Sequence, residues 1–118
     1  MAKQPAAAMA IDVTETGGAT VIRPAGVRLD LVVAPEFRAA LVQLIKSGHR
    51  NLVVDLEDVG FIDSSGLGVL VSALRRARER DGVVRIVCTR DNILKIFRIT
   101  GLDKVFGLHT SVAEAVSN

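Results

Sequence analysis

Two neighbouring serines, Ser64 and Ser65, follow directly after Asp63 and precede an apolar stretch with helical spacing. The apolar residues of that stretch share one face of a helix: Leu67, Leu70, Val71 and Leu74. We therefore expect a helix to begin near Ser64 with Asp63 as its N-cap, because an aspartate side chain accepts hydrogen bonds from the first amides of a helix. Hydroxyl groups at this place lie where the helix dipole favours negative charge.

The chemistry that fits a hydroxyl at the start of a helix is the addition of a charge. A phosphate on Ser65 would be stabilised by the backbone N–H groups that are free in the first helical turn. Asp63 and any other nearby carboxylate would repel the same phosphate. The two serines are thus predicted to form a site that a phosphate can switch, and the alternative is a capping cluster with a structural role alone.

Hydrolysis by a nucleophilic serine is not favoured. Such a serine needs a base, and the two histidines of the chain, His49 and His109, follow a predicted helix and a predicted strand without any motif around them. The Gly-x-Ser-x-Gly elbow is also absent around Ser64 and Ser65. We expect no catalytic residue and no enzymatic activity.

Cofactor and metal sites are not predicted either. The spacing of Gly60, Gly66 and Gly68 fits neither of the glycine-rich loops that hold nucleotide phosphates, and no lysine follows them. Glycine at these positions more plausibly lets another backbone or a partner protein approach the helix start. One cysteine, Cys88, and two distant histidines do not form a ligand set for a metal ion.

Charged and apolar residues near the serines suggest how a partner would bind. Five acids could gather at one end of the sheet: Asp30, Asp55, Glu57, Asp58 and Asp63. Val69 could remain partly exposed beside the serines as part of a protein-binding patch, or it could pack in the core. Four arginines, Arg75, Arg76, Arg78 and Arg80, end the predicted helix as a solvated face or as a basic patch for an acidic partner.

The elements that must position these residues alternate along the chain. A hairpin of two strands, residues 11–16 and 20–24, is predicted around Gly17-Gly18. A turn-like stretch, residues 26–31, leads to a helix that Pro35 begins and Gly48 ends. A buried strand at Val53-Val54-Asp55-Leu56 precedes the helix of the serines.

The C-terminal third continues the same alternation. It is predicted to hold a strand at residues 83–88, a helix capped by Asp91 or Asn92, a short strand at residues 105–108 and a last helix opened by Ser111. Gly82 and Gly101 are expected to end the second and third helices. The fold class is α/β, with a mixed sheet of four to five strands, an N-terminal hairpin followed by largely parallel strands, and about four packed helices.

Composition restricts the function classes. A chain of 118 residues with 49% hydrophobic residues is sufficient for one domain, predicted over residues 11–117 after a flexible tail at residues 1–10. A net charge of +2, four phenylalanines and no tyrosine or tryptophan give no indication of direct nucleic-acid binding. No segment approaches the roughly 20 apolar residues that cross a membrane. We expect a cytoplasmic protein.

The block Asp63-Ser64-Ser65-Gly66-Leu67-Gly68-Val69-Leu70, with Leu56-Glu57-Asp58-Val59-Gly60-Phe61-Ile62 before it, resembles the STAS-domain anti-sigma factor antagonist family. The resemblance extends from about Ile11 to Ala115 and includes Leu29-Asp30 and Ala34-Pro35-Glu36-Phe37. It also includes the ending Ile99-Thr100-Gly101-Leu102-Asp103-Lys104-Val105-Phe106. At Arg28 the chain departs from the family's pattern, in which we expect an acid.

The resemblance implies a single STAS-like domain that binds an anti-sigma factor with serine kinase activity and thereby releases a sigma factor. Phosphorylation of Ser65 by that partner would end the interaction, and a serine phosphatase would restore it. Asp30 and Asp63 would border the phosphorylated serine. The partner would cover a surface that includes Ser64, Gly66, Leu67, Gly68 and Val69.

A second hypothesis belongs to another class. The glycine-bordered helix start could hold a nucleotide or another small anion, which would make the chain a STAS-type sensing module that regulates another protein. Calorimetry against purine nucleotides separates the two hypotheses, because an antagonist does not require a saturable ligand.

Overall fold

The computed structural model describes residues 11–24 and 26–117. Its elements in chain order are β1 (Ile11–Thr16), β2 (Ala19–Pro24), β3 (Arg28–Leu29), α1 (Ala34–Lys46), β4 (Asn51–Asp55), β5 (Phe61–Ile62), α2 (Ser64–Arg78), β6 (Val83–Val87), α3 (Asp91–Thr100), the 3₁₀ helix η1 (Leu102–Lys104), β7 (Gly107–His109) and α4 (Val112–Ser117). The predicted flexible tail, residues 1–10, lies outside the described residues.

Five strands form the main sheet in the order β1-β2-β4-β6-β7. β1 and β2 are antiparallel, and their turn uses Gly17 and Gly18 at φ values of 56° and 83°, which glycine adopts readily. The pairs β2–β4, β4–β6 and β6–β7 are all parallel. The predicted mixed sheet, with an N-terminal hairpin followed by parallel strands, is confirmed.

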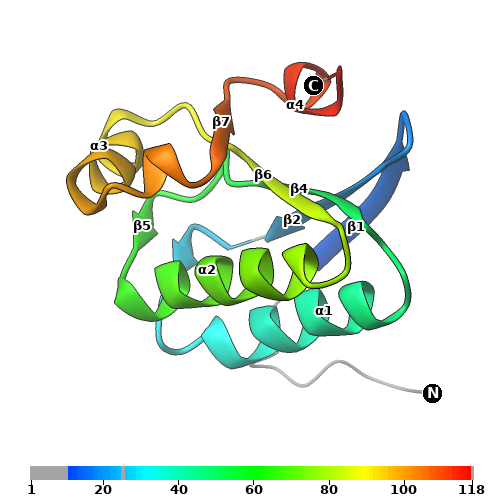
Figure 1. Cartoon of the computed structure of the whole chain (residues 1–118). Helices are drawn as coiled ribbons and strands as arrows, with labels where there is room; N and C mark the ends of the chain where they lie inside the picture. Colours follow the sequence, from blue (N-terminus) through cyan, green and yellow to red (C-terminus); the bar gives the residue numbers. More distant parts are fainter. Residues whose placement is uncertain (1–10, 25, 118) are drawn as a thin grey trace.

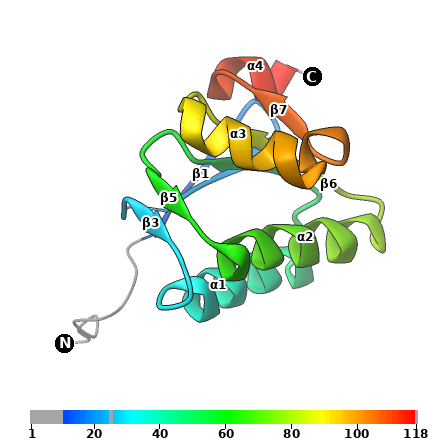
Figure 2. The same ribbon diagram turned by 90° about the vertical axis from the view of Figure 1, so that its left-hand side faces the viewer.

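Helices cover the two faces of the sheet unequally. α1 and α2 lie side by side on one face, whereas the short α4 lies on the opposite face (Figures 1 and 2). The main core fills the space between the sheet and the α1–α2 layer, and α3 adds Ile93 and Phe97 to it. A smaller cluster under α4 includes Val21, Val53 and Ala115. Cys88 is 1% exposed, and burial raises the pKa of its thiol.

The buried face of α2 differs from the expected stripe. Val69 and Ala73 are 1% and 2% exposed, so both belong to the core, while Leu67 and Val71 lie half-buried at its margins. The inward face is centred on small and branched residues spaced three or four apart, which let the helix pack closely on the sheet. The prediction that Val69 stays partly exposed for a partner is therefore wrong, and its alternative, core packing, is correct.

A second sheet of two short parallel strands was not predicted. Arg28 pairs with Phe61 and Leu29 pairs with Ile62, so part of the segment expected to be a turn is strand β3. Figure 2 shows β3 beside β5, with the chain running on from them into α1 and α2. This pairing brings residues near Asp30 to the start of α2.

Some predicted ends of elements need correction. α3 begins at Asp91 after Arg90, which makes no side-chain cap, so neither Asp91 nor Asn92 is the N-cap. The Asn92 side chain instead donates a hydrogen bond to the Gly60 carbonyl at 2.9 Å. Gly101 does end α3, at a φ of 78°.

Two further segments are displaced from their predicted places. The last strand comprises Gly107–His109 rather than residues 105–108, because Val105 lies in the turn that follows η1. After α2 the left-handed residue is Asp81, at a φ of 61°, and not Gly82. A Cβ on Gly82 would lie 2.8 Å from the Arg50 carbonyl oxygen, so the glycine is needed for close packing instead.

Candidate functional site

The start of α2 is fixed by one side chain. Asp63 follows β5 in an extended conformation, with φ of −111° and ψ of −175°, and its Oδ1 accepts hydrogen bonds from the N–H groups of Ser65 at 2.9 Å and Gly66 at 3.0 Å. This is the predicted N-cap. A cap of this kind stabilises a helix by about 1 kcal/mol.

The second carboxylate oxygen of Asp63 connects α2 with the loop before α1. Asp63 Oδ2 accepts a hydrogen bond from the Leu31 N–H at 3.0 Å. Gly66 tightens the same junction, because a Cβ at this position would overlap the Leu29 carbonyl oxygen and lie 3.0 Å from the Ile62 and Leu29 side chains. Asp63 and Gly66 therefore hold β3, the loop before α1 and the start of α2 together as one unit.

Both serines lie at the surface of this unit. Ser64 is exposed and Ser65 is half-buried, as positions N1 and N2 of α2. They line a hollow of about 480 Å³ together with Leu31, Ala34, Pro35, Arg38 and Gly68. The Ser65 hydroxyl thus belongs to a recess between the starts of α1 and α2.

The free amides expected at the helix start are fewer than predicted. Asp63 Oδ1 occupies the N–H groups of Ser65 and Gly66, and the Leu67 N–H donates to the Asp63 carbonyl at 3.0 Å. Among the four first amides of α2, that of Ser64 alone has no hydrogen-bond partner within residues 11–24 and 26–117. Asp63 therefore already accepts hydrogen bonds from most of the N–H groups at the N-terminal end of the helix.

Asp30 lies beside this unit and is ionised. Its Oδ2 accepts a hydrogen bond from the Arg28 Nε at 2.9 Å, and its Oδ1 accepts one from the Val32 N–H at 3.1 Å. The Arg28 guanidinium, helped by the backbone N–H groups of Val33 and Val32, holds the pKa of Asp30 below its ordinary value. The Arg28 guanidinium also stacks 4.2 Å from the centre of the Phe61 ring. Arg28, the residue that departs from the family's pattern, thus forms an ion pair with Asp30.

The other acids form a separate group at the end of β4. Asp55 is 1% exposed and receives the Arg23 guanidinium through Nη2 at 2.7 Å and Nε at 3.1 Å, while Glu57 and Asp58 contact the same arginine at 3.3 Å and 3.5 Å. Burial, and then the charge of Asp55, raise the pKa of Glu57. The five acids that could gather at one end of the sheet thus form two groups, with Asp55, Glu57 and Asp58 on Arg23 and with Asp30 and Asp63 at the start of α2.

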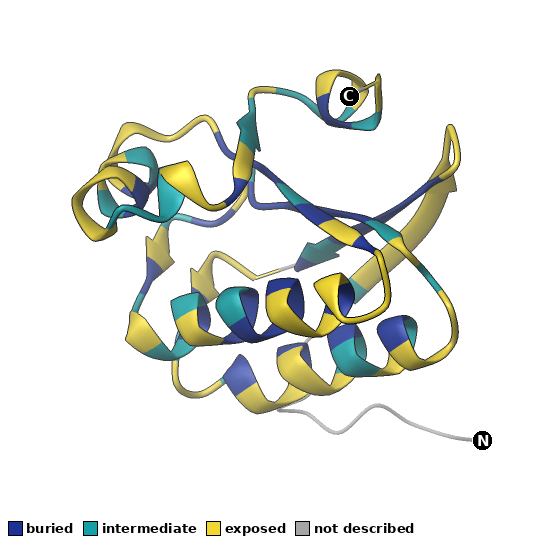
Figure 3. Cartoon of the chain, viewed as in Figure 1, coloured by how far each residue is buried: buried dark blue, intermediate teal, exposed yellow. Residues whose placement is uncertain are grey.

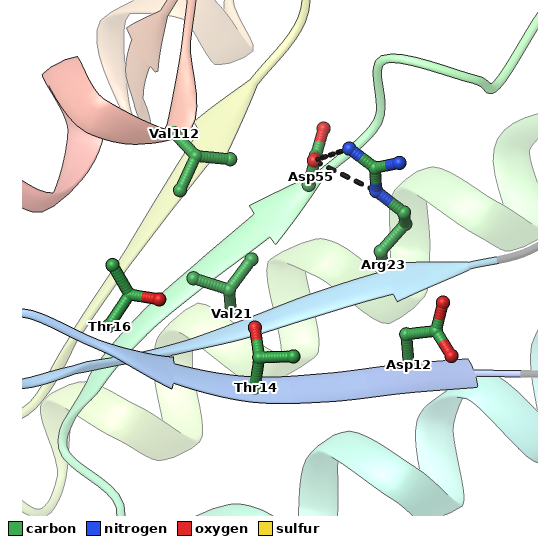
Figure 4. Close-up of a pocket in the computed structure, with 7 residues that line it drawn as sticks. All are labelled: Asp12, Thr14, Thr16, Val21, Arg23, Asp55 and Val112. Atoms are coloured by element: carbon green, nitrogen blue, oxygen red, sulfur yellow. Dashed lines mark hydrogen bonds and ion pairs between the residues drawn. The ribbon is translucent and has the colours of Figure 1, made fainter.

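Arg23 and Asp55, drawn in Figure 4, line a pocket of about 290 Å³. The pocket lies on the sheet face that carries α4, and Val112 of that helix forms one of its walls. Within the described chain the two histidines also have partners away from the serines. His49 contacts Thr20 at 2.8 Å, and His109 contacts Glu114 at 3.5 Å. Neither histidine is placed to act as a base for Ser65.

Exposed apolar side chains flank the serines, and sequence reasoning missed them. Leu31 and Val32 are 69% and 77% exposed in the loop that Asp63 holds, and Phe61 of β5 is 41% exposed. Figure 3 shows exposed residues in this loop and at the tip of α2, with half-buried and buried residues following along the helix. The available signal was the apolar run Leu31-Val32-Val33 directly before Ala34-Pro35, which fits neither a helical nor a strand pattern. We call Leu31, Val32 and Phe61 the apolar rim.

A metal-binding group and a membrane-spanning helix are both absent from the described residues. Residues 11–24 and 26–117 contain no group of three or more His, Cys, Asp or Glu side chains that could hold a metal ion. None of the helices within these ranges has the length and apolar character needed to span a membrane.

Comparison with known proteins identifies a matching domain family and several similar proteins. Residues 10–115 match the STAS domain. The chain is 36% identical over 77 residues to an anti-sigma-B factor antagonist of Staphylococcus aureus, covering 65% of this chain and 71% of that protein. It is 30% identical over 98 residues to the anti-sigma-B factor antagonist of Bacillus subtilis, covering 83% and 88%.

Solved structures share the fold. An anti-sigma factor antagonist from Mycobacterium paratuberculosis superposes with a TM-score of 0.81 at 24% identity, covering 98% of this chain and 97% of that one. The Bacillus cell fate determinant SpoIIAA in its phosphorylated form superposes with a TM-score of 0.70 at 24% identity, covering 92% and 97%.

Proposed function

The chain belongs to the STAS domain family, and we propose that it is an anti-sigma factor antagonist whose binding is switched off by phosphorylation of Ser65. Unphosphorylated, it binds an anti-sigma factor with serine kinase activity, and that factor then releases a sigma factor. The partner phosphorylates Ser65 with ATP, and a serine phosphatase removes the phosphate. The protein acts in the bacterial cytoplasm, without membrane or direct nucleic-acid contact.

One observation carries this proposal. Ser65 lies partly exposed at the start of α2, in a hollow that is also lined by Leu31 of the apolar rim and by Ala34 and Pro35. Exposed apolar residues around a polar centre are typical of a surface that another protein covers. A hydroxyl inside such a surface is accessible in the free protein. It can therefore enter the active site of a partner that is a kinase.

The physical effect of a phosphate supports the direction of the switch. Covering a large apolar side chain such as Leu31 or Val32 contributes roughly 1.5–3 kcal/mol to binding. A phosphate adds about −1.5 to −2 charges, and burying that charge without a partner costs more than the apolar contacts contribute. Asp63, which is within two residues of Ser65, adds repulsion. Phosphorylation therefore weakens the complex.

The transfer itself needs no base from this chain. The Ser65 Oγ forms a bond with the γ-phosphorus of ATP as the bond to the β,γ-bridging oxygen breaks, ADP leaves, and the hydroxyl proton passes to the kinase. The chain's contribution is to present Ser65 on a rigid helix start. Relatives in this family that are named anti-sigma-B factor antagonists support the proposed antagonist role.

The phosphorylation site is tested by incubating the wild type, Ser64→Ala and Ser65→Ala with the cognate anti-sigma factor and ATP, followed by peptide mapping by mass spectrometry. We expect one phosphate on Ser65 in the wild type and in Ser64→Ala, and none in Ser65→Ala. Ser64 is the matched control because it is adjacent and more exposed. A phosphate on Ser64, or on the Ser65→Ala variant, contradicts the assignment.

A further inference from the structure

The hollow beside Ser65 also contains an arginine from the neighbouring helix. We infer that Arg38 of α1 is the internal partner of the phosphate on Ser65 and forms an ion pair with it between α1 and α2. The inference rests on the proposed function, because it concerns the phosphorylated state of the same site. It assigns Arg38 a role only when the phosphate is present.

The phosphate needs a side-chain partner because the helix start cannot supply enough donors. Asp63 already occupies the amides of Ser65 and Gly66. Asp63 also repels a phosphate, and the Arg28 guanidinium is already bound to Asp30 and stacked on Phe61. Ion pairs with arginine are the usual means by which a protein holds a phosphoserine.

Arg38 is placed for this role and is weakly held where it lies. It lines the same hollow of about 480 Å³ as both serines and is exposed to solvent. Within the described chain its guanidinium makes one hydrogen bond, from Nη1 to the Ser72 hydroxyl at 3.5 Å. A hydrogen bond of this length is at the limit of the useful range, so leaving it costs little.

Gly68 keeps the path between Arg38 and Ser65 open. Ser65, Gly68 and Ser72 are spaced by three and four residues, so they lie on one face of α2. A Cβ on Gly68 would meet nothing within 4 Å, so the side-chain position between Ser65 and Ser72 on this face is open. A guanidinium at Ser72 can therefore move along this face toward Ser65.

The direction of α1 favours the same movement. α1 and α2 run side by side in the same direction, with their starts at the same end of the molecule (Figure 1). Side chains of a helix lean toward its N-terminus, which for Arg38 is the end where Ser65 lies. An ion pair at this position compensates part of the phosphate charge while the apolar rim is uncovered.

The inference is tested on protein that carries phosphoserine at position 65 incorporated during translation, so that no kinase is needed. The second ionisation of the phosphate is followed by ³¹P NMR titration in the wild type, Arg38→Gln, Arg38→Lys and Arg75→Gln. Arg75 is the matched control because it is also exposed but lines a different hollow, with Val71 and Val105.

We expect the pKa of the phosphate to be lower in the wild type than in Arg38→Gln by roughly one unit, since a nearby cation favours the dianion. Arg38→Lys should keep most of the shift and Arg75→Gln all of it. Equal phosphate pKa values in Arg38→Gln and the wild type would overturn the inference. The melting temperatures of the unphosphorylated wild type and its three variants are expected to agree within about 2 °C. Such agreement shows that a shift in the phosphate pKa does not come from misfolding.

The two proposals fail separately. Peptide mapping after the kinase reaction decides whether Ser65 is the natural target, and it does not depend on Arg38. The titration decides whether Arg38 contacts a phosphate at position 65, and it does not depend on the kinase.

Discussion

Two residues of the α2 start determine how Ser65 is presented. Asp63 fixes the first amides of the helix and ties the loop before α1 to it through Leu31. Gly66 lets the helix approach the Leu29 backbone so closely that no side chain fits. The position of Ser65 relative to the apolar rim therefore depends on Asp63 and Gly66.

Substitution of Gly66 by alanine is predicted to destabilise the fold. Its Cβ would overlap the Leu29 carbonyl oxygen, and overpacking of this kind costs about 1–3 kcal/mol. Chemical denaturation should show a free energy of unfolding lowered by about 2 kcal/mol.

Gly68 provides the control for this substitution, two residues along the same helix. A Cβ there meets nothing within 4 Å, so Gly68→Ala should raise the stability by up to about 1 kcal/mol through helix propensity. If both variants changed the stability in the same direction, Gly66 would not have the packing role described.

At this scale the sequence predicted the capping residue but not the exposure of its neighbours. Asp63 was identifiable because aspartate before serine and an apolar repeat is a local signal. For Val69 the sequence left both exposure and core packing open, because the repeat of leucines does not show that the buried face also includes Gly66 and Ala73. The apolar run at Leu31 and Val32 is visible in the sequence, but its exposure is not, since it depends on how Asp63 holds the loop.

At the scale of elements, α1 and α2 act as a pair at both ends. Their starts form the hollow around Ser65, and their C-terminal ends are joined by Arg80, whose Nη1 donates to the carbonyls of Ile45 at 3.2 Å and Lys46 at 3.4 Å. Arg80 follows α2 and satisfies carbonyl groups at the end of α1 that lack intrahelical partners. One of the four arginines predicted to be a solvated face thus has a structural contact.

Arg80→Ala is predicted to lower the free energy of unfolding by about 1 kcal/mol, because two α1 carbonyls lose a charged donor. Arg76 is the control, since it is exposed and its side chain makes no hydrogen bond or ion pair within the described residues. Arg76→Ala should change the stability by less than about 0.5 kcal/mol. Equal effects in thermal or chemical denaturation would show that the Arg80 contact contributes nothing.

The longer elements were predictable and the two-residue strands were not. The hairpin, α1, α2 and the parallel order followed from periodicity, proline and glycine signals over five residues or more. β3 and β5 have two residues each, too few for any periodic pattern, and they form because Arg28 and Leu29 meet Phe61 and Ile62 across the fold. The division of the acids between Arg23 and the α2 start depends on that long-range pairing as well.

At the scale of the whole molecule, the switch is proposed to work without a large change of fold. The sheet, its core and the Asp63 cap hold the start of α2 rigidly, so a phosphate alters the charge of a preformed surface. The apolar rim supplies the contacts that favour a partner, and Asp63 with the phosphate opposes them. In this proposal, the balance between these two terms decides whether the protein binds an anti-sigma factor.

The most direct test of this account is the affinity of the isolated protein for its cognate anti-sigma factor, measured by calorimetry with unmodified protein and with protein carrying phosphoserine at position 65. We predict saturable binding of the unmodified form and at least about 100-fold weaker binding of the phosphorylated form, a difference of roughly 2.7 kcal/mol. Equal affinities of the two forms would contradict the claim that the charge on Ser65 controls the interaction.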